Sequence, residues 1–343
     1  MFFFTSPIGL GHATRDVAII NNLKFKKDIK INFVTGSAAY TFLINYGLNT
    51  FNLYDPPKFN VESGKVNHSF IWLVKYLSYY KKCKDIAKKI LEENIEQIIV
   101  SDEDFASIST AQEKKITRIL ITDIINTSFT KGITSIIEKT LNKKLCRLIK
   151  QCDCVIIPDY GSDTENFRYV GPIVREIHES RETLRKRFNF TKKTIVASVG
   201  GTEAGKYLIE KVIESFRRLK TKLDIDLVII AGPTLRINPT IDFRLFGYVP
   251  NLHEYIYASD LLISLAGRST MDESIVYNVP GIFIPLKNHF EQEEGAKRLG
   301  FGYKDIFRLD KLIEEKLDLN YNRDKKNVKN GAKTAAEIIS SFV

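Results

Sequence analysis

Apolar runs and amphipathic segments alternate along almost the whole chain, and this alternation limits the possible folds more than any other feature. The chain begins with an apolar run at residues 1–7, followed by a helical pattern at 13–23 in which Val17, Ile20 and Leu23 share a face. Further apolar runs in the first half lie at residues 30–36, 97–102, 116–123 and 153–159. Strands that alternate with helices favour a parallel sheet covered by helices, so we predict an α/β protein.

The same pattern starts again in the second half. Apolar runs lie at residues 194–201, 226–232, 260–267 and 280–286. Between the halves, Gly161, Gly171 and Pro172 interrupt the pattern and mark a joint. We therefore predict two Rossmann-like domains, at residues 1–165 and 166–325. A final helix at about residues 326–343 is expected to return to the first domain.

Composition is consistent with two domains and leaves the partner open. The chain has 343 residues and 44% hydrophobic residues, enough for ordinary cores. Its formal net charge of +10 favours a polyanion, which could be nucleic acid, anionic lipid or a phosphorylated substrate. No apolar run approaches the ~18 residues that span a bilayer, and no secretory signal is visible. We expect a cytoplasmic protein, soluble or peripheral on the cytoplasmic face of a membrane.

The cysteines and histidines give no sign of a metal site. Cys83, Cys146, Cys152 and Cys154 form no CxxC pair, and the 5 histidines do not fall at zinc-ligand spacings. We expect reduced, structural cysteines and no metal requirement.

The segment at residues 68–89 is aromatic first and basic afterwards. A helix of this composition is expected either to pack in the core with a solvated lysine face or to meet an anionic membrane surface or a lipid-linked molecule.

The loop after the first strand contains a candidate base. Gly9 and Gly11 allow a tight turn before a helix, whose first turn concentrates unpaired N–H groups. His12 lies at this helix start, where an imidazole either bonds to the backbone or takes a proton from a hydroxyl near neutral pH. A carboxylate on the other ring nitrogen would orient it. Asp102 is our preferred partner and Asp104 the alternative, because both follow a strand whose carboxyl end should border the ligand crevice.

Two glycine-containing turns in the second half are suited to phosphate. Gly200, Gly201 and Thr202 lie between a strand and a helix, where backbone N–H groups and a hydroxyl can donate to a diphosphate. The GxxxxGK[ST] pattern is absent there, which argues against an ATPase or GTPase.

The second turn is the most specific site in the sequence. It holds Gly267, Arg268, Ser269, Thr270 and Glu273 at the start of a predicted helix. The two hydroxyls can donate to phosphate from the first turn, and Glu273 lies one turn further on the same side. A carboxylate there can accept hydrogen bonds from both hydroxyls of a ribose, and Arg268 either neutralises phosphate or faces solvent. This arrangement favours a ribonucleotide ligand.

The loop after the last predicted strand holds polar groups suited to a sugar. Gln292 can both donate to and accept from sugar hydroxyls, and Asn288 and His289 are further candidates. The alternative is an ordinary solvated loop.

In this order, the motifs resemble those of the GT-B glycosyltransferases, and especially the MurG-type enzymes, which transfer N-acetylglucosamine from UDP to a lipid-linked acceptor. The 19-residue spacing from Glu273 to Gln292 is similar to that of the MurG type. The resemblance implies that Glu273 holds ribose, Thr270 binds phosphate and Gln292 contacts the donor sugar. The Gly11-His12 pair resembles the family's Gly-Gly-His element, with Leu10 in place of the preceding glycine.

The resemblance implies two Rossmann-like domains facing a central cleft and an inverting UDP-sugar glycosyltransferase with His12 as base. It also implies a saccharide or lipid-linked acceptor, no required metal and no nucleic-acid partner. One alternative is an isomerase like the UDP-N-acetylglucosamine 2-epimerases, which would need several acids around the sugar, and the first half offers few. The other alternative is a non-catalytic nucleotide- or RNA-binding protein.

Overall fold

The chain forms two compact units in the computed structural model, which describes residues 1–23, 29–94, 98–130, 132–200, 203–233, 235–238, 241–318 and 328–343. Unit 1 comprises Met1–Phe59, His68–Val174 and Asn330–Val343. Unit 2 comprises Asn60–Asn67 and Arg175–Lys329. Each unit has its own parallel sheet, which confirms the predicted α/β class with two Rossmann-like domains.

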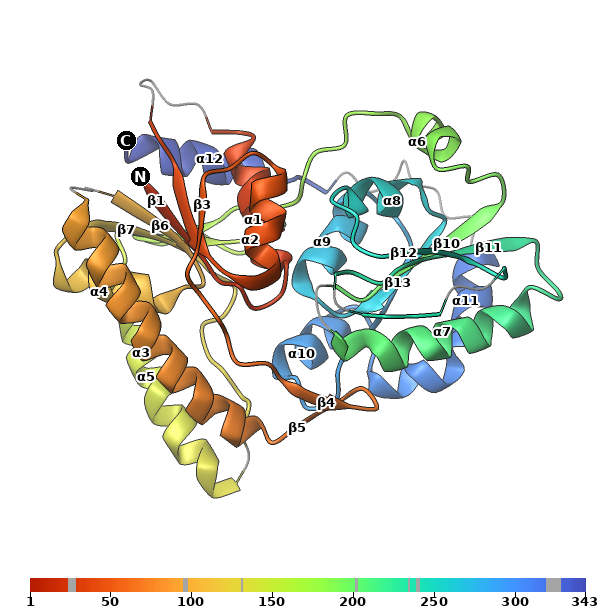
Figure 1. The fold of residues 1–343 in the computed structure, drawn as a ribbon, viewed down its shortest axis with the longest axis horizontal. Coiled ribbons are helices and arrows are strands. Elements are labelled where there is room, and N and C mark those ends of the chain that lie inside the picture. The colour runs from red at the N-terminus through yellow and green to blue at the C-terminus, as the bar shows by residue number, and fades with distance from the viewer. Residues whose placement is uncertain are drawn as a thin grey trace. The chain divides into compact units, whose positions relative to one another are not determined.

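Unit 1 is built on a parallel sheet with the strand order β3-β2-β1-β6-β7-β8-β9 among the described residues. Its strands are β1 (Phe2–Thr5), β2 (Asn32–Thr35), β3 (Thr50–Asn52), β6 (Ile98–Asp102), β7 (Thr117–Ile121), β8 (Cys154–Ile157) and β9 (Phe167–Tyr169). Its helices are α1 (Gly11–Ile20), α2 (Ser37–Asn45), α3 (Ser69–Glu93), α4 (Phe105–Glu113), α5 (Ser135–Lys150) and α12 (Ala332–Ser341), with a 3-10 turn at Gly132–Thr134. Helices α3, α4 and α5 cover one face of the sheet, and α1, α2 and α12 cover the other (Figure 1).

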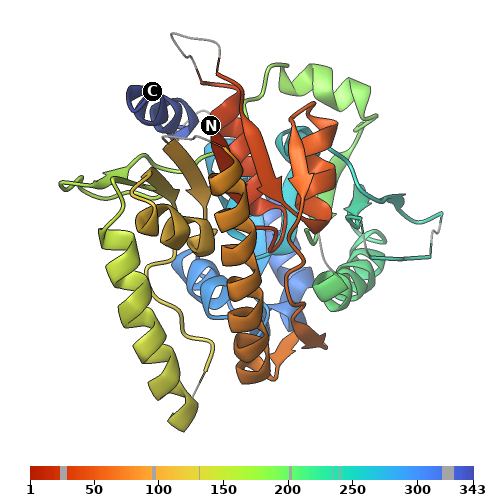
Figure 2. The same ribbon diagram turned by 60° about the vertical axis from the view of Figure 1, so that its left-hand side comes forward.

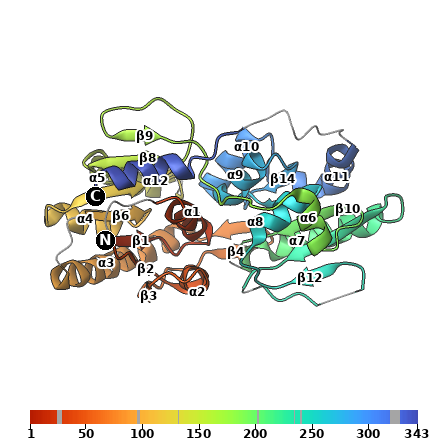
Figure 3. The same cartoon turned by 90° about the horizontal axis from the view of Figure 1, so that it is seen from above.

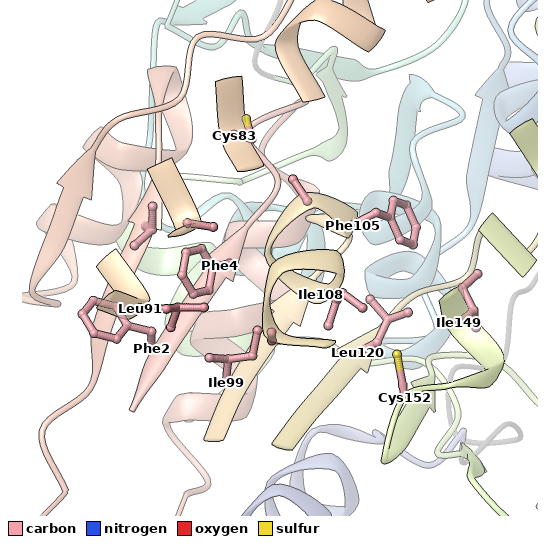
Figure 4. Close-up of a cluster of buried hydrophobic side chains, with 14 of the residues drawn as sticks. Phe2, Phe4, Cys83, Leu91, Ile99, Phe105, Ile108, Leu120, Ile149 and Cys152 are labelled. Carbon is pink, nitrogen blue, oxygen red and sulfur yellow. The ribbon is translucent and has the colours of Figure 1, made fainter. Parts of the chain in front are cut away.

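The alternation of side chains along β1 explains this layering. Phe2 and Phe4 join a buried cluster with residues of α3, α4 and α5 (Figure 4). Phe3 points to the opposite face and contacts the ring of Phe33, with the ring centroids 5.1 Å apart. Because both faces are covered, successive side chains of the strand are buried whichever way they point, which accounts for the uninterrupted FFF run. Burial of each phenylalanine contributes about 1.5–3 kcal/mol to folding.

The boundary between the units differs from the predicted one at residues 165 and 166. Strand β9 pairs with β8 in the first sheet, with Val155 opposite Phe167, so residues up to Val174 belong to unit 1. The chain returns to unit 1 at Asn330, where the Asn330 side chain donates to the Val174 carbonyl at 2.8 Å. The N-terminus of β1 and the C-terminal α12 lie close together in unit 1 (Figure 3).

Unit 2 contains a parallel sheet with the strand order β12-β11-β10-β13-β14 among the described residues. Its strands are β10 (Lys193–Ser198), β11 (Ile225–Ile230), β12 (Arg244–Phe246), β13 (Leu261–Leu265) and β14 (Gly281–Ile284), and a separate hairpin consists of β4 (Asn60–Glu62) and β5 (Lys65–Asn67). Its helices are α6 (Arg181–Arg187), α7 (Lys206–Leu219), α8 (Leu252–Ala258), α9 (Arg268–Val276), α10 (Phe290–Arg298) and α11 (Leu309–Asp318), with 3-10 turns at Glu203–Gly205 and Tyr303–Arg308. Helices α7 and α11 lie on one face, and α6, α8 and α9 on the other (Figure 1).

Helix α3 is both a core helix and an exposed one. Trp72, Leu73, Cys83, Ala87 and Leu91 are buried. Other apolar residues on its first turns are exposed: Phe70, Ile71, Val74 and Leu77. The buried residues agree with the expectation of a core helix, whereas contact with a membrane surface stays a prediction. No helix in the described parts of the chain has the length and hydropathy of a membrane span.

Candidate active site

The order of strands in unit 1 brings His12 to the end of β6. Strands β1 and β6 are parallel neighbours, with Thr5 opposite Asp102, so both chains leave the sheet at the same edge. After β1 the chain turns through Gly9, whose φ of +83° favours glycine, and enters α1 at Gly11. His12 is the second residue of that helix, beside the last residue of β6.

Asp102 holds both His12 and Arg15. The Nδ1 of His12 lies 2.8 Å from Oδ1 of Asp102. Arg15 donates from Nε to the other Asp102 oxygen at 2.8 Å and from Nη2 to the first at 2.5 Å. Arg15 follows His12 by one helical turn, so the two side chains lie on one face of α1. This spacing could have identified Arg15 as a site residue from the sequence.

Asp104, the alternative partner of His12, has a structural role. It caps α4, where its side chain accepts from the Ala106 amide at 3.2 Å, and it accepts from the Tyr54 hydroxyl at 2.7 Å. Asp102 and Asp104 differ in this way because the residue between them, Glu103, has a left-handed backbone with φ of +54°, which ends the strand.

Glu103 is a further acidic group at this site. Its Oε2 lies 3.7 Å from Nε2 of His12, the nitrogen opposite Asp102. Its Oε1 accepts from the Thr122 hydroxyl at 3.1 Å and from the Asp123 amide at 3.2 Å. The first half therefore gathers more acids at this site than its sequence suggested. Asp102 is the last residue of β6, and Asp123, which contacts Glu103, lies just after the neighbouring strand β7.

The buried charges set the protonation of the cluster. Burial lowers the pKa of His12, but the charges of Asp102 and Glu103 outweigh it and raise this pKa to about 9. For Asp102, the contributions of Arg15 and His12 outweigh burial and lower the pKa. Burial and the Asp123 charge raise the pKa of Glu103. In the ligand-free protein, the His12 ring is therefore largely protonated at neutral pH.

The predicted phosphate and sugar groups of unit 2 follow three adjacent strands. Gly200 comes after β10, Gly267 after β13 and Asn288 after β14. These strands are parallel neighbours in the sheet, so their carboxyl ends share one edge. Gly200 has φ of +75° and is exposed, and a β-carbon added there would meet no described atom within 4 Å. Gly201 and Thr202 lie outside the described residues.

Glu273 is paired with an arginine that the sequence did not indicate. Oε1 of Glu273 accepts from Nη2 of Arg175 at 2.9 Å, and both side chains are about 95% buried, with exposed fractions of 5% and 4%. Arg175 also donates to the Pro250 carbonyl at 2.8 Å, while the Tyr277 hydroxyl donates to the Arg175 carbonyl. Burial raises the pKa of Glu273, although Arg175 opposes the shift. Arg175 is a single arginine after the segment that joins the two halves, and no motif around it indicates that it pairs with Glu273.

The other residues of the α9 turn differ in their surroundings. Ser269 and Thr270 are half-buried in the first turn of α9, where their hydroxyls can donate to an anion beside the helix N-terminus. Arg268 donates from Nε to Asp272 at 3.0 Å, so the structure gives it a carboxylate partner on its own helix. Gly267 is the N-cap residue of α9.

The residues predicted to contact sugar brace the loop after β14. Oε1 of Gln292 accepts from the Leu286 amide at 3.0 Å, which leaves its amide nitrogen to donate. Asn288 has φ of +67°, and its backbone amide donates to Glu293 at 3.2 Å. His289 is buried, and burial lowers its pKa to about 4, so it is neutral. In the described parts of the chain, no cluster of three or more His, Cys, Asp or Glu side chains is placed to hold a metal ion.

Comparison with known proteins relates these features to a family. Residues 195–341 match the glycosyltransferase family 28 C-terminal domain. The chain is 26% identical over 265 residues to an uncharacterized glycosyltransferase of Methanopyrus kandleri, covering 71% of this chain and 75% of that one. Matches to two uncharacterized glycosyltransferases of Methanosarcina acetivorans span 59% and 60% of their length.

A longer match is to a UDP-N-acetylglucosamine–N-acetylmuramyl-(pentapeptide) pyrophosphoryl-undecaprenol N-acetylglucosamine transferase of Clostridium botulinum. It is 24% identical over 334 residues, 93% of this chain and 89% of the relative.

Solved structures show the same fold. The glycosyltransferase of kitacinnamycin has a TM-score of 0.65 at 14% identity, over 99% of this chain and 98% of its own. A putative UDP-N-acetylglucosamine 2-epimerase from Listeria monocytogenes has a TM-score of 0.58 at 11% identity, over 99% and 94%. The fold is that of the GT-B glycosyltransferases, residues 195–341 match a glycosyltransferase domain, and the relatives are glycosyltransferases. Together these findings support an enzyme that transfers sugars.

Proposed function

We propose that the protein transfers a sugar, N-acetylglucosamine, from a UDP-sugar to an acceptor hydroxyl with inversion at the anomeric carbon. The observation that carries this proposal is the pairing of His12 with Asp102 at the carboxyl edge of the first sheet. The exposed fraction of the His12 side chain is 18%, so the ring is open to a substrate, whereas Asp102 is fully buried behind it. This is the arrangement of an oriented general base.

In the proposed reaction, the neutral ring accepts the acceptor's hydroxyl proton at Nε2. The acceptor oxygen forms a bond to the anomeric carbon, and the bond from that carbon to the β-phosphate oxygen breaks with its electron pair on UDP. Asp102 stabilises the imidazolium that results. A single displacement of this kind inverts the anomeric configuration.

Unit 2 supplies the donor site in this proposal. The helix N-termini and hydroxyls at the sheet edge would stabilise the leaving diphosphate without a required metal. Glu273, turned toward Arg175 in the ligand-free protein, would accept from the ribose hydroxyls through its second oxygen. The choice of UDP and N-acetylglucosamine is supported by the name of the Clostridium botulinum relative.

Acceptor-dependent release of UDP tests the proposal. Wild-type protein should release UDP from UDP-N-acetylglucosamine only when a saccharide or polyprenyl-diphosphate saccharide acceptor is present, and the product's linkage should be inverted. His12→Ala should reduce turnover about 100-fold or more while calorimetry finds UDP affinity nearly unchanged. The exposed His178, substituted in the same way, is the matched control and should retain activity. Full activity of the His12 variant would contradict the assigned base.

A second candidate function is epimerisation of a UDP-sugar with UDP still attached. Two observations favour epimerisation over nucleotide binding without catalysis. The carboxyl groups of Asp102 and Glu103 lie on either side of the His12 ring. The chain also shares its fold with the Listeria monocytogenes protein. Nuclear magnetic resonance of the nucleotide sugar distinguishes the two reactions. A changed sugar on intact UDP, without any acceptor, would establish the isomerase and exclude transfer as the main activity.

The acceptor is proposed to be lipid-linked and the protein peripheral on an anionic membrane surface. Six exposed apolar residues support this, and we call them the apolar patch: Phe70, Ile71, Val74 and Leu77 of α3 with Ile136 and Ile137 of α5. The first turns of the two helices lie at the same end of unit 1 (Figures 1 and 2). Lysines and arginines outnumber acids on both helices, which complements anionic lipid headgroups.

Vesicle flotation tests this localisation. The protein should bind vesicles of phosphatidylcholine with phosphatidylglycerol, and added salt should weaken the binding. The double substitution Ile71→Asp with Val74→Asp should weaken it about tenfold or more, because two apolar contacts become charged. Ile241→Asp, at a fully exposed isoleucine of unit 2, is the control. Equal binding by the double variant and the control would exclude the apolar patch as the contact.

A further inference from the structure

The β4–β5 hairpin comes from the N-terminal half of the sequence but belongs to unit 2 (Figure 1). Glu62 pairs with Lys65, so Ser63 and Gly64 form a two-residue turn. Both turn residues have positive φ, +46° and +72°, as a type I′ hairpin requires. A short isolated hairpin is marginal in water, so its order must come from what it contacts.

The main contact is the loop after β14. The Val66 amide donates to the Lys287 carbonyl at 2.9 Å, and the Lys287 amide donates to the Gly64 carbonyl at 2.9 Å. The Asn288 side chain donates to the Val66 carbonyl at 3.3 Å. Strand β5 thus pairs with the backbone of the loop and helps to hold Asn288 in its left-handed conformation.

The tip of the hairpin is fixed by two tyrosines of unit 2. The Tyr303 hydroxyl donates to the Ser63 carbonyl at 2.8 Å. A β-carbon added at Gly64 would lie 3.1 Å from the ring of Tyr207 and 3.3 Å from that of Tyr303. Tyr207 is the second residue of α7, the helix that follows the Gly200 turn. The tip therefore packs tightly against two rings, with little room for a side chain.

We infer that the β4–β5 hairpin positions the donor-sugar loop at residues 286–289 and thereby contributes to the choice of donor sugar. This inference rests on the proposed function and on the prediction from sequence that Asn288 and Gln292 contact the donor sugar. Hydrogen bonds link the hairpin to the same loop that Gln292 braces by accepting from the Leu286 amide. The Arg175–Glu273 pair, proposed for ribose, is held by other contacts, so the hairpin should affect the sugar and leave UDP itself unaffected.

Two substitutions test the hairpin, with a matched control for one of them. Gly64→Ala forces a side chain against the tyrosine rings, whereas Gly47→Ala has the same backbone cost, since φ there is +73°, but meets no atom within 4 Å. Tyr303→Phe removes the hydrogen bond to Ser63 and keeps the ring. Both test variants should raise KM for UDP-N-acetylglucosamine about two- to tenfold and change the preference over UDP-glucose, with the Kd for UDP unchanged.

The outcomes separate this inference from the proposed function. If wild-type protein neither binds nor uses any UDP-sugar, the proposed function fails, and the hairpin's role in donor choice fails with it. If wild type transfers sugar but Gly64→Ala behaves like Gly47→Ala, or if KM for the UDP-sugar and Kd for UDP rise together, the inference alone is overturned. Amide hydrogen exchange adds a readout that needs no activity. The amides of Val66 and Lys287 should lose protection in Gly64→Ala, while those of β10 should not.

Discussion

At the scale of residues, the protonation of His12 is decided by the acids around it. The carboxylates of Asp102 and Glu103 raise its pKa against the effect of burial, to about 9, yet a general base must be neutral to accept a proton. Activity should therefore rise with pH toward about 9, as the neutral fraction of the ring increases.

Glu103→Gln tests this assignment. The substitution removes a negative charge that raises the His12 pKa, so the rising limb of the kcat/KM profile should move to lower pH. Activity at neutral pH should then rise, whereas Asp102→Asn, which also removes the group that orients the ring, should lower it. The pH dependence of kcat/KM is the measurement. A limb that stays in place would show that Glu103 does not act on His12.

Arg175 and Glu273 form a buried pair whose loss should be costly. Arg175→Met leaves a buried carboxylate without its partner and should lower the free energy of unfolding by about 3–5 kcal/mol. The same change should cost less in a Glu273→Gln background, because no charge is then left unpaired. Arg268→Met, which breaks a pair on one helix, should cost about 1 kcal/mol or less. Urea denaturation measures all four variants, and equal costs in both backgrounds would contradict the coupling.

At the scale of elements, α12 joins unit 1 through a close backbone contact. The Gly331 amide donates to the Pro172 carbonyl at 2.7 Å, and a β-carbon at Gly331 would lie 2.5 Å from the Val170 carbonyl oxygen. The helix buries Ala332, Ala335, Ala336 and Ile339. Small side chains allow α12 to approach α1 closely, so the last helix of the chain is part of the first unit's core.

Gly331→Ala should therefore destabilise unit 1. The contact is with backbone, which cannot move aside as a flexible side chain would, and we expect a loss of about 1–3 kcal/mol. Gly302→Ala is the matched control, because an added β-carbon there meets no atom within 4 Å. Thermal unfolding compares the two variants. Equal melting temperatures would show that α12 can shift without cost.

At the scale of the whole molecule, buried histidines make stability depend on pH. Burial lowers the pKa of His253 to about 2 and that of His289 to about 4, whereas both titrate near ~6.5 in the unfolded chain. Above pH ~6.5 neither state binds these protons, so stability is complete there. As pH falls below that value, only the unfolded state is protonated, and stability declines. His12 acts in the opposite sense, because its raised pKa gives stability that is lost as pH rises through about 9.

We expect the free energy of unfolding to fall below pH ~6.5 by up to about 1.4 kcal/mol per pH unit for each of the two histidines. His253→Leu should make this decline shallower while it keeps an apolar side chain in the site. Denaturant unfolding between pH 7 and pH 5 is the measurement. An unchanged slope in the variant would contradict a neutral, buried His253.

Much of the fold could be predicted from local patterns. Runs such as Phe2–Phe4 and Leu261–Ile263 are apolar at every position, because both faces of a parallel sheet are covered, and that pattern can be read without tertiary contacts. The turns at Gly9 and Gly200 are equally local, since positive φ favours glycine. The sequence alone thus determined the α/β class, the two sheets and the positions of the glycine turns that follow strands, and of His12 at a helix start.

The tertiary structure decided which distant groups meet. Asp102 rather than Asp104 reaches His12 because β6 lies beside β1 and the chain leaves the strand at Glu103. Arg175 meets Glu273, and residues 60–67 join unit 2, through contacts between segments far apart in the chain. Local patterns encode periodicity and turn geometry. Strand order and long-range pairing depend on how whole surfaces pack, which no short segment specifies.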